Sequence, residues 1–192
     1  MLLITDYLSK FAKLTEEEKN CFEGYVSSKK SVEGTYITQQ GEICRKLIYL
    51  QKGATAMVYE RKGRIFIKDF IFENSLASVY ESFITQQPAR YSLKAINSCV
   101  YQSIAYHDIQ QLYQKIPQLN KAAKILTENV YLNMSQRFES LITLSAEQRY
   151  LELLDRRPSL LAEVPQYMIA SYLGITDVAL SRIRNRLSKK NE

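Results

Sequence analysis

The sequence has few of the side chains that metal sites and catalytic centres use. Its 192 residues include one histidine, His107, and three cysteines, Cys21, Cys44 and Cys99, with no Cys-x-x-Cys pair. An odd number of widely spaced cysteines argues against a disulfide framework, a zinc site or an iron–sulfur cluster. A lone histidine without a nucleophile and an orienting carboxylate makes a poor catalytic base. We therefore expect buried reduced thiols, no metal, no cofactor and no enzymatic activity, with His107 capping a helix or lying on its surface.

Glycine and proline are also scarce, and long apolar runs are missing. Six glycines and four prolines exclude collagen-like or low-complexity material. No uninterrupted apolar run approaches the roughly 18 residues of a membrane helix. The opening MLLITDYLSKFAKL lacks the basic flank and cleavage site of a secretory signal. With 46% hydrophobic residues the chain can build a packed core, so we expect a folded cytoplasmic protein with no membrane partner.

The chain carries a moderate positive charge. Lysine and arginine number 26 against 20 aspartates and glutamates, which gives a net charge of +6 at pH 7. This balance permits binding to a polyanion such as nucleic acid without requiring it. Whether the protein binds a polyanion therefore depends on where the positive charges lie along the chain.

The N-terminal part changes from a helical to a strand pattern. Residues 1–30 are typical of short helices, with Thr15 as an N-cap before three glutamates. From Ser31 to about Ile104 short segments rich in Val, Ile, Tyr, Phe and Thr alternate with glycine turns. Three strands are predicted at 47–51, 54–60 and 64–70, and two more within 91–106 around a turn at Asn97. This pattern predicts an antiparallel β-roll or jelly roll.

A long helix follows the strands. From Pro117 to about Leu144 no glycine or proline interrupts the chain. An apolar stripe runs down one face of this helix, formed by Leu119, Ala123, Leu126, Val130, Met134, Phe138 and Leu141. The stripe can lie on the core of its own domain or form the seam of a homodimer. We favour the dimer, because about 40 Å of helix is too long for five-residue strands to cover.

The strongest motif is QYMIASYLGITDVALSRIRN near the C-terminus, over 166–185. Ala170 is small where two helices cross closely, and Gly174 can take the positive φ of a tight turn. Thr176 is suited to cap the second helix. Ile175, Leu180 and Ile183 have the spacing that fills the wedge between the helices. The spacing of small, glycine and apolar positions predicts a helix-turn-helix.

The second helix of this motif has two different faces. Residues 176–192 carry five basic and two acidic side chains. Winding at about 100° per residue places the apolar residues on one side. The candidate DNA-binding residues lie opposite or at the edges: Thr176, Asp177, Val178, Ser181, Arg182, Arg184, Asn185 and Arg186. We expect Arg182 and Asn185 to donate to base edges, Val178 to contact a thymine methyl, and the edge arginines Arg184 and Arg186 to hold phosphates. The alternative is a solvated, arginine-rich surface helix.

The order of these parts resembles the Crp/Fnr family of bacterial transcription regulators over almost the full chain. The segments that carry the resemblance are LIYLQKGATAMVY, LYQKIP and, most specifically, IASYLGITDVALSRIR. The resemblance implies an α+β protein with a cyclic-nucleotide-binding-like roll, a dimerisation helix and a helix-turn-helix. It implies a homodimer that binds double-stranded DNA. Family members have Arg, Glu and a further Arg in the recognition helix, where this chain has Asp177, Val178 and Arg182. The DNA sequence of the operator therefore cannot be taken from the family.

The effector region departs further from the family pattern. Relatives that bind cyclic nucleotides hold the phosphate and ribose with a Gly-Glu pair and an Arg followed by Ser or Thr. Here Ser78 and Val79 replace the pair, and Tyr91 follows Arg90. The nearest glutamate, Glu81, lies two residues after Val79, the position that corresponds to the family's glutamate. We therefore expect no response to cyclic AMP, and take Glu81, Arg90 and Tyr91 as candidates for the pocket of an unidentified small-molecule effector.

The resemblance implies three parts: a sensor domain at 1–115, a dimerisation helix at 116–144 and a DNA-binding domain at 145–192. The alternative function is a ligand-binding or protein-interaction module whose helical end docks on another protein. The effect of salt on binding distinguishes the two functions. DNA binding through phosphates weakens steeply as ionic strength rises, whereas binding through an apolar protein interface does not.

Overall fold

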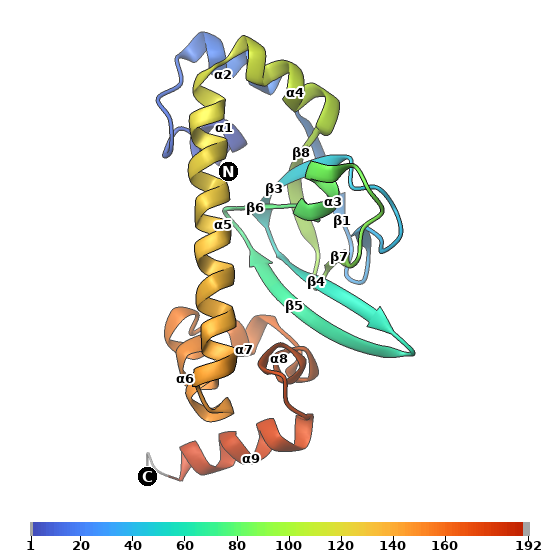
Figure 1. Ribbon diagram of the computed structural model, residues 1–192, viewed down its shortest axis with the longest axis vertical. Helices are drawn as coiled ribbons and strands as arrows, with labels where there is room; N and C mark the ends of the chain where they lie inside the picture. The colour runs from blue at the N-terminus through green and yellow to red at the C-terminus, as the bar shows by residue number, and fades with distance from the viewer. Residues whose placement is uncertain (1, 190–192) are drawn as a thin grey trace.

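The computed structural model describes residues 2–189 and shows an α+β fold (Figure 1). Met1 and residues 190–192, which include the last lysine of the predicted recognition helix, lie outside the described part. An antiparallel roll comes first, then a long helix beside it, then a group of short helices at the far end of the long helix. The fold class predicted from the sequence is confirmed.

Two short helices open the chain, as predicted: α1 (Ile4–Leu8) and α2 (Glu16–Glu23). The end of the helical region predicted over 1–30 is wrong, because Ser27–Ser31 form a strand that pairs with Cys99–Ala105. Thr15 caps α2 in a reciprocal capping box with Glu18. The backbone N–H of Glu18 donates to Thr15 Oγ1 over 3.2 Å, and the Thr15 N–H donates to the Glu18 carboxylate over 2.8 Å. Two N–H groups that a helix start leaves unpaired are satisfied in this way.

The roll consists of two four-stranded antiparallel sheets. The first has the order β1 (Ser27–Ser31), β8 (Cys99–Ala105), β3 (Lys46–Lys52), β6 (Ser75–Ala77). The second has the order β2 (Tyr36–Thr38), β7 (Ser92–Ala95), β4 (Ala54–Arg61), β5 (Arg64–Phe72). The five strands predicted between residues 47 and 106 are confirmed as β3, β4, β5, β7 and β8.

One glycine decides the turn between β3 and β4. Gly53 has φ of +96°, and a Cβ at this position would lie 2.6 Å from the Ser98 carbonyl oxygen. The Asn97 side chain accepts a hydrogen bond from the Ala54 N–H over 2.8 Å at the same place. Only a residue without a side chain lets the two turns approach this closely.

The first sheet has helices on its outer face. The N–H of Ile4 in α1 donates to the Gln102 side chain of β8 over 2.6 Å, and Gln102 donates to Glu23 of α2 over 3.2 Å. Ile48 and Leu50 of β3 are fully buried in the core of the roll. The predicted burial of the free cysteines is confirmed for Cys44 and Cys99 and wrong for Cys21, which is half-buried; burial raises the pKa of the Cys99 thiol.

The helix α3 (Tyr80–Thr85) lies between β6 and β7 within the roll, and α4 (Tyr106–Lys115) and α5 (Gln118–Thr143) connect the roll to the C-terminal part. His107 is exposed in the first turn of α4, and its Nε2 lies 2.8 Å from the Gln111 amide. The N-cap of α4 is Ala105, so the surface role expected for His107 is confirmed and the capping role is wrong. None of the helices described over 2–189 has the length and apolar character needed to cross a membrane.

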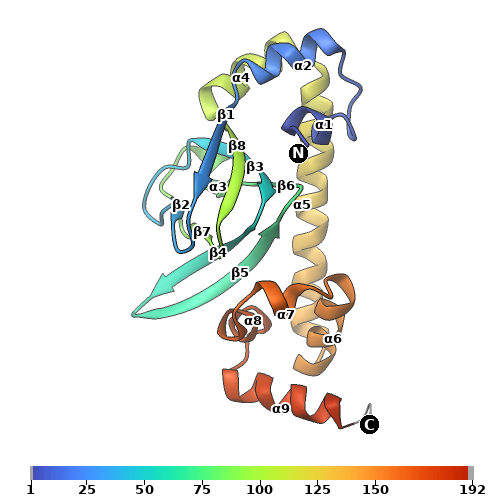
Figure 2. The same ribbon diagram turned by 180° about the vertical axis from the view of Figure 1, so that it is seen from behind.

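The C-terminal helices pack on the second sheet. They are α6 (Ala146–Arg156), α7 (Leu160–Glu163), α8 (Gln166–Leu173) and α9 (Asp177–Ser188). One apolar cluster joins Ile67, Phe70 and Phe72 of β5 to Ile169 and Leu173 of α8. The views from the two sides show β5 passing directly above α7 and α8 (Figure 2). The C-terminal helices therefore share a core with the roll.

Candidate functional site

The turn between α8 and α9 has the geometry predicted from Gly174. This residue lies in the left-handed region, with φ of +71° and ψ of 30°. The Gly174 N–H donates to the Ser171 carbonyl over 3.1 Å and the Ile175 N–H to the Ala170 carbonyl over 3.0 Å. This pair of bonds is a Schellman motif, which satisfies two of the four carbonyls left open at a helix end. Thr176 then caps α9 by accepting from the Ala179 N–H over 3.2 Å.

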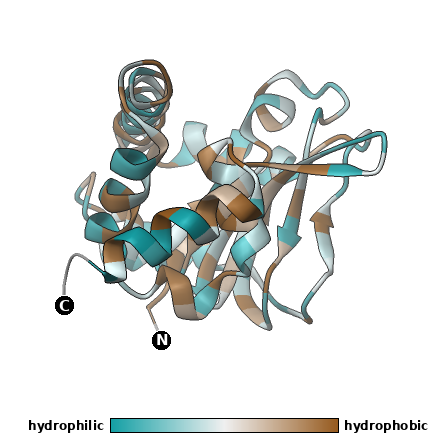
Figure 3. Ribbon diagram, turned by 90° about the horizontal axis from the view of Figure 1, so that it is seen from below, coloured by the Kyte–Doolittle hydropathy of each residue, from teal (hydrophilic) through white to brown (hydrophobic). Residues whose placement is uncertain are grey.

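The predicted wedge residues hold the two helices together. Ala170, Leu180 and Ile183 are buried, and Ile175 and Leu187 are half-buried against the same cluster. Burial on this side leaves the opposite side of α9 in solvent. Figure 3 shows α9 from below, crossing the end of the molecule with hydrophilic stretches along its length.

The candidate DNA-binding residues occupy that solvent side. Val178 is 61% exposed, and Arg184 is half-buried. The other six are exposed: Thr176, Asp177, Ser181, Arg182, Asn185 and Arg186. Within residues 2–189 no protein group lies at hydrogen-bonding distance from the side chains of Arg182 or Asn185. These two side chains keep their donors open toward solvent.

The two edge arginines turn back toward α6. Arg186 forms an ion pair with Glu147, and Arg184 lies beside Tyr150. Burial raises the pKa of Tyr150, and the Arg184 guanidinium partly offsets this rise. The helical periodicity of α9 could not show these contacts, because Tyr150 lies 34 residues before Arg184 and Glu147 lies 39 residues before Arg186. A phosphate that recruits Arg186 has to compete with Glu147.

A joint between the roll and the helix-turn-helix forms at the edge strand β5. The Ser171 hydroxyl of α8 donates to the Ile65 carbonyl over 3.1 Å and accepts from the Ile67 N–H over 3.0 Å. Next to it the rings of Phe70 and Tyr172 lie 5.3 Å apart. Because β5 is the last strand of its sheet, its outer N–H and C=O groups need such partners.

Two arginines complete the end of α8. Arg137 of α5 donates to the Tyr172 carbonyl, and its guanidinium lies 3.5 Å from the centroid of the Tyr172 ring. Arg149 of α6 donates to the Leu173 carbonyl over 2.9 Å. With the Schellman bonds, all four terminal carbonyls of α8 are satisfied. Cations at the negative end of a helix dipole are favourable, so the charges strengthen the joint. The sequence analysis did not identify Arg137, Arg149 or Ser171.

The segment that replaces the family's Gly-Glu pair points inward. Val79 is fully buried, and the Ser78 hydroxyl donates to the Lys46 carbonyl over 3.2 Å. Both side chains are therefore buried away from solvent. Arg90 instead forms an exposed ion pair with Glu81, with 3.5 Å between Nη1 and Oε1.

Tyr91 lies in the core of the roll. Its ring centroid is 5.3 Å from that of Tyr59, and Lys68 Nζ lies 4.1 Å above the ring. Burial raises the pKa of the Tyr91 phenol well above its ordinary value, so it stays neutral near pH 7. Burial lowers the pKa of Lys68.

A cavity of about 670 Å³ adjoins this region, and we call it the hairpin cavity. It is lined by Gln40, Tyr59, Arg61, Phe66 and Arg90. Of the three effector residues predicted from the sequence, Arg90 lines the cavity, Glu81 is held by Arg90 and Tyr91 lies beneath Tyr59. The β4–β5 hairpin contributes three lining residues that the sequence analysis missed. Phe66 lies between Ile65 and Ile67, the two residues that bond Ser171.

The apolar stripe of α5 divides into two parts. Leu119 is 3% exposed and belongs to the core of its own roll, so it cannot face a partner. Leu126 is half-buried against the same core, and Ala123 is half-buried. From Val130 onward the apolar side chains are exposed: Val130, Tyr131, Leu132, Met134, Phe138, Leu141 and Ile142. Among the elements described over residues 2–189, none lies against the outer side of the middle of α5 (Figures 1 and 2).

Comparisons with known proteins agree with this architecture at the level of fold. No family model matches the sequence, and no curated protein matches it. Among solved structures, the c-di-GMP-responsive regulator CLP of Xanthomonas campestris is 16% identical, with a TM-score of 0.73 over 92% of this chain and 93% of that one. FixK2 of Bradyrhizobium japonicum is 16% identical, with a TM-score of 0.75 over 86% of each chain. The catabolite activator protein of Thermus thermophilus is 16% identical, with a TM-score of 0.59 over 96% and 88%.

The chain has the fold of the Crp/Fnr regulators. The Crp/Fnr resemblance stated from the sequence is confirmed for the fold. Within residues 2–189 no three His, Cys, Asp or Glu side chains are grouped so that they could hold a metal ion.

The joint at β5 makes a testable prediction. Ser171→Ala should lower the free energy of unfolding by about 1 to 3 kcal/mol, because the Ile67 N–H and Ile65 carbonyl lose their shared partner. The Ile67 amide should exchange faster with solvent. Ser181→Ala, in an exposed helical position, gains the same helix propensity and should show neither effect. Equal exchange rates of the Ile67 amide in both variants would contradict the role of Ser171 in joining α8 to β5.

Proposed function

We propose that this protein is a homodimeric, sequence-specific DNA-binding transcription regulator of the Crp/Fnr type, and not an enzyme. The observation that carries the proposal is the helix-turn-helix whose exposed side presents Arg182 and Asn185 at the end of the molecule. We assign sensing to residues 1–115, dimerisation to 116–144 and DNA binding to 145–192.

The chemistry of α9 suits the major groove. Arg182 offers a fork of donors that matches guanine, and the Asn185 amide matches adenine. Val178 can contact a thymine methyl, while Ser181 and Thr176 can donate to phosphates or bases. Asp177 can accept from a cytosine amino group, which would differ from the arginine that the family pattern has at this position. Arg184 and Arg186 at the edges are placed to hold phosphates once they release their α6 contacts.

The exposed stripe of α5 supports dimerisation. Seven large apolar side chains between Val130 and Ile142 are exposed on one helix, which is unusual for a monomer. At about 100° per residue all of them except Leu132 lie on one side of the helix and form the stripe. A second copy related by a two-fold axis would cover the stripe with the same side chains. Such a dimer would present two α9 helices, as a palindromic operator requires.

The hairpin cavity is the proposed effector site. Its volume of about 670 Å³ suits a small molecule, and Arg61 favours an anionic one. The buried Ser78 and Val79 argue against cyclic nucleotides. The fold supports a sensor role for the roll, and the identity of the effector stays open.

Base reading and phosphate holding can be separated by two substitutions. Arg182→Ala should cost about 1 to 3 kcal/mol per half-site on the selected operator and relax the preference at one base pair, while non-specific binding stays nearly intact. Arg186→Ala should weaken operator and random duplex alike and reduce the salt slope by about one unit per half-site. Fluorescence anisotropy over a salt series measures both. Equal losses on specific and non-specific DNA for both variants would contradict the orientation assigned to α9.

The dimer seam can be tested without disturbing the core. Met134→Glu together with Phe138→Glu should give a folded monomer with weaker DNA binding. The monomer should fold because both side chains are exposed within the chain, at 55% and 66%, and the dimer should be lost because like charges would face each other across the two-fold axis. Asn129→Glu with Gln136→Glu adds the same charge on the other side of α5 and should leave the dimer intact. Analytical ultracentrifugation reports the mass of each. An unchanged dimer in the Met134/Phe138 variant would show that this stripe is not the interface.

Cyclic nucleotides should not bind at physiological concentrations. Without a carboxylate for the ribose hydroxyls, burial of those groups costs about 1 to 3 kcal/mol, or one to two decades of affinity. Arg90, the remaining phosphate ligand, is already paired with Glu81. Calorimetry with cyclic AMP and cyclic GMP should show no heat of binding. Micromolar affinity for either would overturn this part of the proposal.

A further inference from the structure

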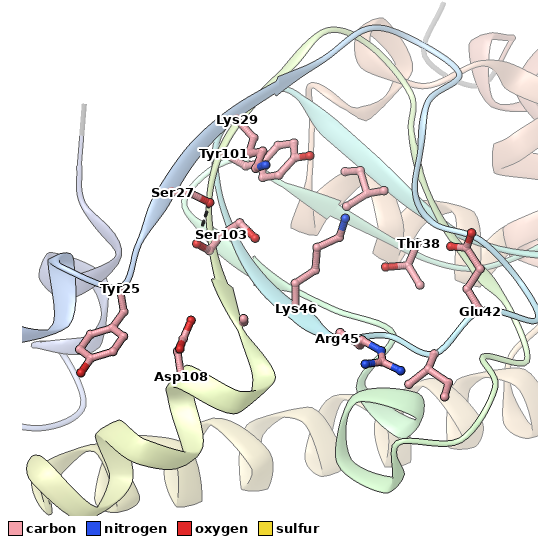
Figure 4. A pocket seen from close by; sticks show the side chains of 13 residues that line it. Tyr25, Ser27, Lys29, Thr38, Glu42, Arg45, Lys46, Tyr101, Ser103 and Asp108 are labelled. Carbon is pink, nitrogen blue, oxygen red and sulfur yellow. Dashed lines mark hydrogen bonds between the residues drawn. The ribbon is translucent and has the colours of Figure 1, made fainter.

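The roll contains a second cavity that shares no lining residue with the hairpin cavity. It has a volume of about 540 Å³ and lies where β1, β3 and β8 meet the loop 39–45 and the start of α4. We call it the inner cavity; Figure 4 shows its lining side chains. The sequence analysis assigned no role to these residues.

Polar side chains replace the apolar core at this end of the sheet. On β3, Lys46 continues the row of Ile48 and Leu50, which are fully buried. On β1, Ser27 and Lys29 pair with Ser103 and Tyr101 of β8, which line the same cavity. In Figure 4 the Lys46 ammonium group extends into the space between Tyr101 on one side and Thr38 on the other. A lysine in an inward-facing row needs a polar or charged neighbour.

The cavity concentrates positive charge without a counter-ion. Lys29, Arg45 and Lys46 all line it, and within residues 2–189 no carboxylate lies within 4.0 Å of any of them. Lys46 is half-buried while Lys29 and Arg45 are exposed, so the three like charges repel one another across a partly solvated space, at a modest cost. An anion placed among them would remove this cost.

The two carboxylates at the cavity do not fill that role. The Glu42 carboxylate accepts a hydrogen bond from the Gln39 N–H over 3.1 Å, which holds it to its own loop. Asp108 lies in the first turn of α4, where a helix start favours a negative charge. Both are therefore stabilised locally, and the three cations keep their capacity for an added anion.

Hydroxyl groups surround the same space. Thr38, Ser103 and Tyr101 contribute hydroxyls to the lining, and the Ser27 hydroxyl donates to the Ser103 carbonyl over 3.3 Å. Lysine and arginine with neutral hydroxyl donors are the groups that bind oxyanions such as phosphate and carboxylate. The volume lies in the range of small-molecule sites and excludes a macromolecule.

We propose that the inner cavity binds a small organic anion whose phosphate or carboxylate group contacts Lys46, Lys29 and Arg45. The hydroxyls of Thr38, Ser103 and Tyr101 bind the polar remainder of the ligand. This site is separate from the proposed effector site and does not depend on DNA binding.

The test uses the full chain and two probes, inorganic pyrophosphate for phosphates and citrate for carboxylates. Calorimetry at constant ionic strength should show saturable binding of at least one probe, and that probe should raise the unfolding temperature. Lys46→Gln should weaken binding by about tenfold or more, since a charge-assisted contact is lost. Lys52→Gln makes the same change at the exposed far end of β3 and should leave affinity within about twofold.

Two further variants keep the proposal falsifiable. Lys29→Gln, on exposed β1, should also weaken binding of the probe, and it replaces Lys46→Gln in the test if that variant fails to fold. Arg61→Gln in the hairpin cavity should have no effect. The proposal is overturned if neither probe binds saturably, if Lys46→Gln and Lys52→Gln bind alike, or if Arg61→Gln alone abolishes binding.

Discussion

Side chains satisfy the backbone groups of both the open edge of β5 and the C-terminal end of α8, and the position of α9 depends on this joint. Ser171 bonds both Ile65 and Ile67, while Arg137 and Arg149 donate to the last two carbonyls of α8. An edge strand and a helix end each leave polar groups that are costly to bury unpaired. The bonds of Ser171 hold α8 on the roll, and the Schellman turn at Gly174 then directs α9 outward.

The same strand connects the joint to the hairpin cavity. Phe66 lines the cavity, and its two neighbours on β5 bond Ser171. Arg137 brings α5 into the joint, so the roll, the long helix and the helix-turn-helix meet at one place. A ligand in the hairpin cavity shifts α9 only to the extent that it binds one arrangement of this joint better than another. In the proposed regulator, β5 is therefore the element through which an effector would act.

The features that the sequence predicted well are set by neighbours along the chain. Gly174 and Thr176 determine the turn and the cap of α9 within a few residues, and Gly53 does the same for the β3–β4 turn. The periodicity of α5 predicted a helix but not which part of its stripe is covered. Coverage depends on the roll, where Tyr80 of α3 reaches Thr127 of α5 over 2.6 Å. The partners of Arg186 and Arg90, and the lysines of the inner cavity, likewise depend on contacts between distant segments.

The central claim is that α9 reads a DNA sequence, and selection of binding sites from random duplex DNA with the purified full chain tests it most directly. The account predicts enrichment of a two-fold symmetric site with half-sites about one helical turn apart. It also predicts that retention of this site weakens steeply as the salt concentration rises. Failure to enrich any sequence at every salt concentration would contradict the account and favour a module that binds a ligand or another protein.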